Sequence, residues 1–333
     1  MPFSEKFIEK YNFSLYGRRI MLLERNQVIE LLRCPKYQTP LALEGNNLVS
    51  KNNEPLHTAK YEFADQYPVV IDFDQSILNK KDTESAASVI NRPAYAGLSG
   101  MIKRILLPRS KATKDNVELL FTELLKKDGK PRVLMVGGGT PGQSMEQFYE
   151  DPRVELVSFD IYASDSVQFV ADAHNIPLPD NEFDGVIIQA VLEHVLDPEK
   201  VVSEIYRVLK DDGIVYAETP FLQHVHEGAY DFTRYTESGH RFLFKDFELI
   251  KSGTTAGAGT QLLWAIEYFT RGIFRSRIIG KVMKLLFFWL QYLDSFIPES
   301  YNIDAASGVF FAGRKHVKPL SDEEIVSHYG GAQ

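Results

Sequence analysis

The sequence predicts an α/β fold built on a doubly wound, mostly parallel sheet. A small β-rich module precedes this sheet, and a helical insertion comes before its last strand. Two patterns predict this fold. Short apolar runs alternate with amphipathic helical segments between residues 113 and 220, which is typical of a parallel sheet covered on both faces. Two more β-rich runs, 246–253 and 307–315, enclose an aromatic helical stretch.

The bulk composition sets the limits of function and location. With 333 residues the chain can form one large domain with a smaller attachment. The net charge of -8 argues against a nucleic-acid partner, because an acidic surface gains little from counterion release. The single cysteine, Cys34, excludes an internal disulfide and a cysteine-based zinc cluster, and suits a reducing compartment. We see no secretory leader and no long uncharged apolar run, so a cytoplasmic protein is expected.

The N-terminal region is expected to span residues 1–110. It includes a hairpin around residues 45–47, a β-rich run at 67–73 and a linker over 74–108. The main domain is expected over 111–316, with its helical insertion at about 258–303, and the tail over 317–333. Within the main domain, Thr113 is expected to cap the first helix and Gly129 to stop it. Strands are expected at 132–136, 154–160, 167–171, 184–189 and 213–219, and helices at 145–149 and 198–209.

A glycine-rich turn directly follows the strand at 132–136. Glycines at this position let the backbone turn sharply and bring a ligand close to main-chain N–H groups. Asp160 ends the next strand about 20 residues later, the spacing at which a carboxylate meets ribose hydroxyls. Such turns are also common without a ligand, and Asp160 could simply cap a strand end. The glycines concerned are Gly137, Gly138, Gly139 and Gly142.

Later motifs indicate which ligand this would be. The succession IPLPDNEFD, VLEHV and RVLKDDG resembles class I methyltransferases of the small-molecule type, and the resemblance extends over roughly residues 113–314. It implies a Rossmann-like fold, methyltransferase activity and S-adenosyl-L-methionine as cofactor. By this resemblance two glycines pass beneath the methionine moiety and Asp160 holds the ribose, while a carboxylate and a backbone N–H receive the adenine and a strand end lies beside the sulfonium. The cofactor-binding residues are then Gly137, Gly138, Gly139, Asp160, Ile161, Asp172, Ala173, Gln189 and Ala190.

The chain departs from the family pattern at two positions. Met135 occupies the place of an acidic residue that helps to hold the cofactor's amino group, and Pro141 delays the third glycine by one position. These departures motivate one alternative function, a cofactor-binding scaffold without catalysis.

The loop over residues 221–236 is the expected acceptor side of the site, because it follows a central strand at the carboxyl edge of the sheet. Methyl transfer needs alignment of acceptor, methyl and sulfur, and a base helps if the acceptor is a hydroxyl. The candidate catalytic residues are His226 first, then His224, with His194 of the LEHV motif. Asp231 and Arg234 could instead form an ion pair. An H-x-H metal site is conceivable, but the sequence fixes no carboxylate partner, so no metal is predicted.

The two flanking segments leave alternatives open. Residues 34–73 resemble a degenerate zinc-ribbon or Trm112-like module, in which Cys34 remains but Tyr37 replaces its partner. We expect a packing or dimerisation element without zinc. Charges at 281, 284 and 294 argue against a membrane span in the insertion. A lid or a homodimer contact is expected first, and a peripheral membrane contact through 278–297 is the alternative.

Together these features predict a methyltransferase acting at oxygen on a small molecule, a glycan or a surface-polysaccharide precursor. Runs similar to 220–236 occur in methyltransferase-like proteins associated with bacterial surface-glycan synthesis. A second alternative is a subunit that modifies a macromolecule together with a partner, which the Trm112-like segment motivates.

Overall fold

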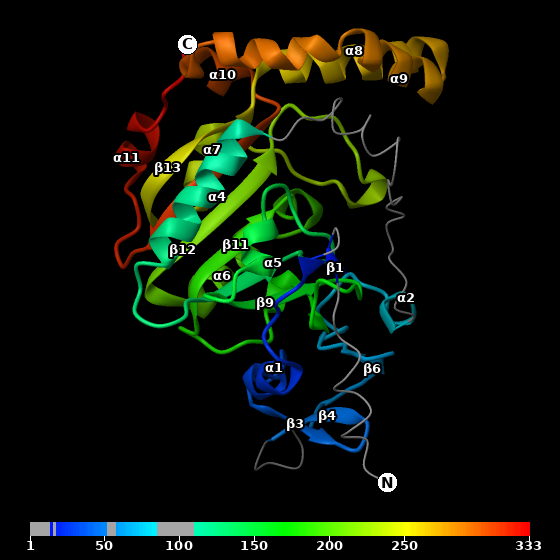
Figure 1. Ribbon diagram of the computed structural model, residues 1–333, viewed down its shortest axis with the longest axis vertical. Helices are drawn as coiled ribbons and strands as arrows, with labels where there is room; N and C mark the ends of the chain where they lie inside the picture. Colours follow the sequence, from blue (N-terminus) through cyan, green and yellow to red (C-terminus); the bar gives the residue numbers. More distant parts are fainter. Residues whose placement is uncertain (1–13, 16–17, 52–57, 85–109) are drawn as a thin grey trace.

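The computed structural model describes residues 14–15, 18–51, 58–84 and 110–333. Its centre is a seven-stranded sheet with the order β10-β9-β8-β11-β12-β14-β13 (Figure 1). Only β14 runs against its neighbours, which confirms the predicted doubly wound, mostly parallel sheet. The strands are β8 (Arg132–Val136), β9 (Glu155–Asp160), β10 (Phe169–Val170), β11 (Phe183–Gln189), β12 (Leu209–Pro220), β13 (Phe247–Ala256) and β14 (Gly308–Lys315).

Helices cover both faces because successive strand residues point to opposite sides. In β8, Val133 and Met135 pack with α4 (Lys111–Leu124) and α5 (Glu146–Glu150). Leu134 and Val136 pack on the other face with α6 (Pro198–Val208) and α7 (Glu237–Leu243). The helical segments predicted at 145–149 and 198–209 are thus confirmed to within one residue at each end.

The predicted ends of the first helix are wrong. Ser110, and not Thr113, caps α4, because its side chain accepts the N–H of Thr113. The Thr113 hydroxyl instead donates to Glu218 at 2.7 Å. The helix already ends at Leu124, before Gly129. A polar side chain that the sequence assigns to capping therefore belongs to the site at the end of β12.

The N-terminal module contains the predicted hairpin, with β3 (Leu41–Glu44) and β4 (Asn47–Ser50) joined through Gly45. The remaining elements are β1 (Ser14–Leu15), β2 (Arg18–Arg19), α1 (Arg25–Leu31), β5 (Lys60–Tyr61), β6 (Phe63–Ala64), β7 (Tyr67–Pro68) and α2 (Lys80–Glu84). Leu32 and Leu48 are fully buried in the same cluster as the α6 side of the sheet. The sulfur of Cys34 lies 3.0 Å from the Tyr61 hydroxyl. The module therefore packs on the sheet, which is one of the two roles expected for it, packing or dimerisation.

The module also meets the edge of the sheet. Val69 forms a parallel bridge with Val170, and the N–H of Val70 donates to the Val170 carbonyl at 2.8 Å. The predicted strand at 67–73 is thus present only in its first residues. Within the predicted linker, residues 80–84 form the short helix α2, and the stretch over 85–108 lies outside the described residues.

The predicted insertion forms a helical layer across one end of the sheet (Figure 1). It consists of α8 (Ala258–Phe274), α9 (Arg277–Leu286), η5 (Phe288–Phe296) and α10 (Glu299–Ala305). Asp294 fixes the start of α8 by accepting the N–H groups of Gly257 and Gly259. In the tail, α11 (Asp322–Ser327) precedes His328, which contacts Glu237 at 2.7 Å. Within the described ranges, no helix combines the length and apolar character needed to cross a membrane.

Candidate active site

The glycine turn and Asp160 form one hydrogen-bonded unit at the carboxyl edge of the sheet. The N–H groups of Gly137 and Gly138 donate to the Phe159 carbonyl at 3.0 and 2.9 Å. The Asp160 carboxylate accepts the N–H of Gly139 at 2.8 Å and that of Ile161 at 2.7 Å. Gly137 has φ +77°, and a Cβ there would lie 2.2 Å from a methyl group of Val191. The structure therefore brings these predicted cofactor residues together, and it shows that Asp160 also shapes the turn.

The predicted adenine position is at the start of η2 (Ala173–Asn175). The Asp172 carboxylate accepts the N–H of His174 at 3.0 Å and lies 2.6 Å from its Nδ1. Burial acts to raise the pKa of Asp172, but hydrogen bonds from His174 and from the Ser76 hydroxyl outweigh it and lower that pKa. Asp172 is thus an ionised acceptor at neutral pH. Sequence reasoning missed Ser76, because it lies in the expected linker.

The predicted methionine end is centred on a partly buried carboxyl group that the sequence reasoning also missed. Glu218, near the end of β12, accepts the side chains of Gln189 at 2.6 Å and Thr113 at 2.7 Å. The Tyr216 hydroxyl donates to it at 2.5 Å. Burial raises the pKa of Glu218, and these three donors counteract the rise. The available signal was a charged residue at the end of an otherwise apolar strand.

Two other residues near this end have distinct environments. Ala190 has φ +55°, a conformation that is unusual for a residue with a side chain and that often marks functional sites. Its N–H donates to the Glu218 carbonyl at 3.0 Å. Met135, which stands in place of the family's acidic residue, is buried in the core on the α4 side. It therefore offers no polar group here.

Two of the three predicted catalytic histidines lie side by side, His194 from the segment after β11 and His226 from the loop after β12. The rings of His194 and His226 are 5.0 Å apart. The His194 Nδ1 donates to the Tyr230 carbonyl at 2.6 Å, so its Nε2 faces Glu193 at 3.6 Å. The N–H of His226 donates to Asp231 at 2.8 Å, and Asp231 forms the predicted ion pair with Arg234. The Asp231 carboxylate also lies 3.4 Å from the His226 Nδ1, so it is placed to orient this ring.

The third histidine lies apart from this pair. His224 stacks on Tyr268 of α8, with ring centroids 4.4 Å apart. Burial lowers the pKa of both His224 and His194, which favours neutral imidazoles. Glu193, in η3 (Leu192–His194), is 1% exposed, and burial raises its pKa to about 8. Glu193 belongs to the VLEHV motif, but the resemblance gives it no role.

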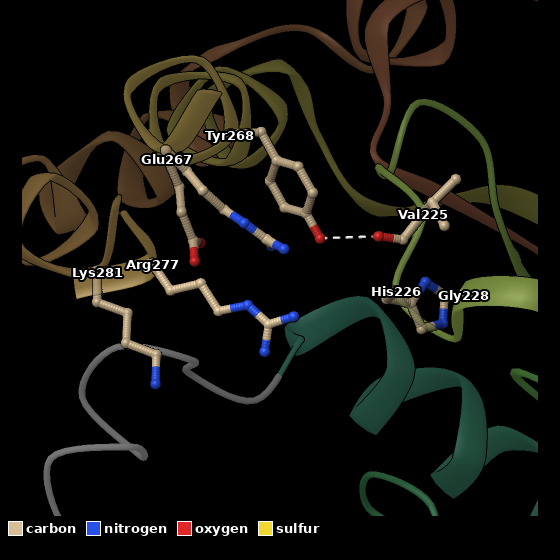
Figure 2. Close-up of a pocket in the computed structure, with 8 residues that line it drawn as sticks. Val225, His226, Gly228, Glu267, Tyr268, Arg277 and Lys281 are labelled. Carbon is tan, nitrogen blue, oxygen red and sulfur yellow. Dashed lines mark hydrogen bonds between the residues drawn. The ribbon is translucent and has the colours of Figure 1, made fainter. Parts of the chain in front are cut away.

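A cavity of about 420 Å³ opens between the loop after β12 and the helical insertion. Figure 2 shows Arg277 and Lys281 of α9 on one side of this cavity and Val225 and His226 on the other. The Tyr268 hydroxyl donates to the Val225 carbonyl at 2.8 Å. The lining residues are Val225, His226, Gly228, Glu267, Tyr268, Arg271, Arg277 and Lys281. Because three of them are cationic and only one is anionic, the cavity has an excess of positive charge. The helical insertion therefore covers one side of the candidate site.

The sequence comparisons find similarity to methyltransferases. Residues 136–217 match a family model described as a methyltransferase domain. A demethylmenaquinone methyltransferase of Renibacterium salmoninarum is 37% identical over 98 residues, which are 26% of this chain and 40% of that protein. A ubiquinone/menaquinone biosynthesis C-methyltransferase of Stutzerimonas stutzeri is 37% identical over 100 residues, 25% of this chain and 39% of that protein. The matches thus span well under half of these relatives.

Solved structures include a phosphoethanolamine N-methyltransferase 2 of Haemonchus contortus with S-adenosyl-L-methionine. It is 16% identical, with a TM-score of 0.44, over 83% of this chain and 71% of that one. The glycine turn and Asp160 lie inside the segment that matches the family model. Residues 136–217 of this chain are therefore similar to a methyltransferase domain, as the resemblance in the sequence implies.

Proposed function

We propose that this protein transfers a methyl group from S-adenosyl-L-methionine to a small-molecule acceptor. The observation that carries the proposal is the unit formed by the glycine turn and Asp160, which lies inside the segment that matches the methyltransferase family. In this proposal the cofactor extends from Asp172 past the glycine turn to Gln189 and Ala190. The acceptor occupies the cavity beside His226.

Calorimetry with S-adenosylmethionine and its demethylated product tests the cofactor site. Asp160→Ala should weaken binding by about 1–3 kcal/mol, or about 5- to 150-fold, because ribose hydroxyls lose their acceptor. Asp165→Ala is the matched control, since it removes an exposed carboxylate from the same loop. Equal affinity of the two variants, or no binding by the unaltered protein, would contradict the proposal.

The cavity supports an acceptor that carries phosphate or carboxylate groups and is methylated at oxygen. Arg271, Arg277 and Lys281 would attract such groups, and His226 lies close enough to the cavity to accept a hydroxyl proton. A nucleotide sugar or a lipid-linked glycan precursor has this chemistry. By their names, one relative reported above is a demethylmenaquinone methyltransferase and the other a ubiquinone/menaquinone biosynthesis C-methyltransferase, so a demethylated quinone is the competing acceptor.

A methyl-donor assay with both acceptor classes separates these possibilities. With the charged acceptor, Arg277→Gln and Lys281→Gln should each raise KM about tenfold with little change in kcat, because they remove uniform binding. Arg275→Gln is the control, since this exposed cation lies outside the cavity lining. Turnover of the quinone alone would overturn the charged-acceptor proposal and leave methyl transfer intact.

The insertion presents an apolar face, defined here as Ile278, Val282, Leu285 and Trp289. All four side chains are exposed, with 75% of Ile278 accessible, so the fold leaves this face uncovered. Their spacing places them on one side of α9 and the start of η5. Cations at 271, 275, 277 and 281 lie next to this face. Because an apolar helix face with adjacent cations suits an anionic lipid surface, we propose peripheral membrane contact here.

A further inference from the structure

We propose that Glu193, His194 and His226 bind a divalent transition-metal ion at the acceptor side of the site. One ligand atom from each residue lies within 4.8 Å of the others. The Nε2 atoms of His194 and His226 are 3.6 and 3.9 Å from Oε1 of Glu193. Metal bonds of about 2.1 Å in tetrahedral geometry place ligand atoms about 3.4 Å apart. The three atoms therefore need to move together by roughly 1 Å or less to reach that spacing.

The groups behind the histidines are those that orient metal ligands. A metal-binding imidazole usually donates its other ring N–H to a carbonyl or carboxylate. The His194 Nδ1 already donates to the Tyr230 carbonyl at 2.6 Å. The His226 Nδ1 lies 3.4 Å from the Asp231 carboxylate, which Arg234 holds in place. Both rings thus direct Nε2 toward the same carboxyl group.

Glu193 gives an independent indication of a missing partner. Its side chain is 1% exposed, and its Oε2 has no hydrogen-bond partner among the residues that the structure describes. A buried carboxyl oxygen without a hydrogen-bond partner is costly unless something compensates it. The backbone around it is firmly held, because the N–H groups of Phe232 and Thr233 both donate to the Glu193 carbonyl. A cation between Glu193 and the two imidazoles would supply the compensation.

The donor set indicates the class of metal. Two imidazoles and one carboxylate suit Zn²⁺, Mn²⁺, Co²⁺ or Fe²⁺ better than Mg²⁺, which prefers oxygen ligands. Three protein ligands also leave a coordination position open, as in catalytic sites. Sequence reasoning predicted no metal, because it paired His226 with His224 and found no carboxylate. The fold instead pairs His226 with a glutamate and a histidine of the LEHV motif.

A role for the ion in catalysis rests on the proposed function, and it would replace the role given there to His226 as a base, because a metal-bound imidazole whose other nitrogen faces Asp231 has no nitrogen left to accept a proton. An acceptor hydroxyl bound in the open position would lose its proton to solvent more easily. Its oxygen would then form a bond to the methyl carbon while the carbon–sulfur bond of the sulfonium breaks. The products are the methyl ether, neutral S-adenosylhomocysteine and one released proton.

Metal titration of the chelator-treated full chain, without an affinity tag, tests the site. Calorimetry with Zn²⁺ and the visible spectrum with Co²⁺ should both show one ion per chain, and excess Mg²⁺ should not compete. Loss of a residue behind a ligand costs about 10- to 100-fold in affinity, so Asp231→Asn should fall in that range. Loss of a ligand in His226→Ala should cost at least about 100-fold. Glu193→Gln is the second ligand variant.

The control is His224→Ala, which removes a neighbouring histidine that stacks on Tyr268 away from the cluster. It should bind Zn²⁺ like the unaltered chain. No stoichiometric binding, or equal affinity of His226→Ala and His224→Ala, overturns the metal proposal. S-adenosylmethionine calorimetry on the same samples separates the two proposals. Cofactor binding without metal binding removes only the metal site, whereas metal binding without cofactor binding removes only the proposed function.

Discussion

Replacing Gly137 with alanine tests whether the glycine turn is held by steric necessity. Its φ of +77° costs a residue with a Cβ about 1–2 kcal/mol. The new Cβ would also lie 2.2 Å from Cγ2 of Val191, and such overpacking costs about 1–3 kcal/mol. Denaturant titration should therefore show a loss of about 2–5 kcal/mol in the free energy of unfolding. Calorimetry should show weaker binding of S-adenosylmethionine.

Gly129→Ala is the matched control, because Gly129 has φ +81° but no atom lies within 4 Å of the place that a Cβ would take there. This variant should lose only the stability that the positive φ costs a residue with a Cβ, about 1–2 kcal/mol, and keep its cofactor affinity. Val191→Ala in the Gly137→Ala background should restore the stability that the clash with Val191 costs. This gain appears as a coupling of about 1–3 kcal/mol in a double-mutant cycle. Equal losses for the two glycine variants, or no coupling to Val191, would refute the reasoning.

Three further predictions concern charge, catalysis and the apolar face. The pKa of Glu193 is raised to about 8, so the metal-free folded state keeps a proton that the unfolded chain releases near pH 4.5. The free energy of unfolding should therefore fall from pH 5 to pH 8 in urea titrations, and Glu193→Gln should remove this fall. Parallel pH curves of the two proteins would contradict the prediction. His226→Ala should lower turnover about 10²–10⁴-fold with unchanged cofactor affinity, and intact turnover after loss of both His224 and His226 would exclude a base from this loop. The double substitution Val282→Asp with Leu285→Asp should abolish sedimentation with phosphatidylglycerol vesicles. If sizing experiments instead show a dimer, and the same substitutions dissociate it, the apolar face is a homodimer contact.

The sequence predicted the sheet well because its strands are continuous apolar runs. The alternation of such runs with helices is a local signal, and it located β8, β9, β11 and β12 correctly. It failed for the strand expected at 167–171, where only Phe169 and Val170 pair. The prediction for Thr113 was wrong because a local pattern cannot show whether a hydroxyl near a helix start caps the helix or donates to a distant carboxyl group.

The candidate site was predictable where a motif is contiguous. The glycine turn and Asp160 follow directly from strand ends, and the structure places them in contact. The cluster of Glu193 with His226 depends on how the loop after β12 folds back. Hydrogen bonds from Phe232 to the Glu193 carbonyl fix that path, and no local pattern encodes them. Long-range contacts of this kind are invisible to spacing arguments.

The bridge between Val69 and Val170 has a consequence for how the chain behaves among its own copies. An open strand edge presents unpaired N–H and carbonyl groups that recruit strands from other molecules. Here the chain's own N-terminal module occupies the outer side of β10, with the Val70 N–H bonded to the Val170 carbonyl. The same module covers apolar side chains on the α6 side of the sheet. A shortened chain beginning at residue 110 would uncover both at once, so it would be a starting point for aggregation and a poor substitute for the intact protein.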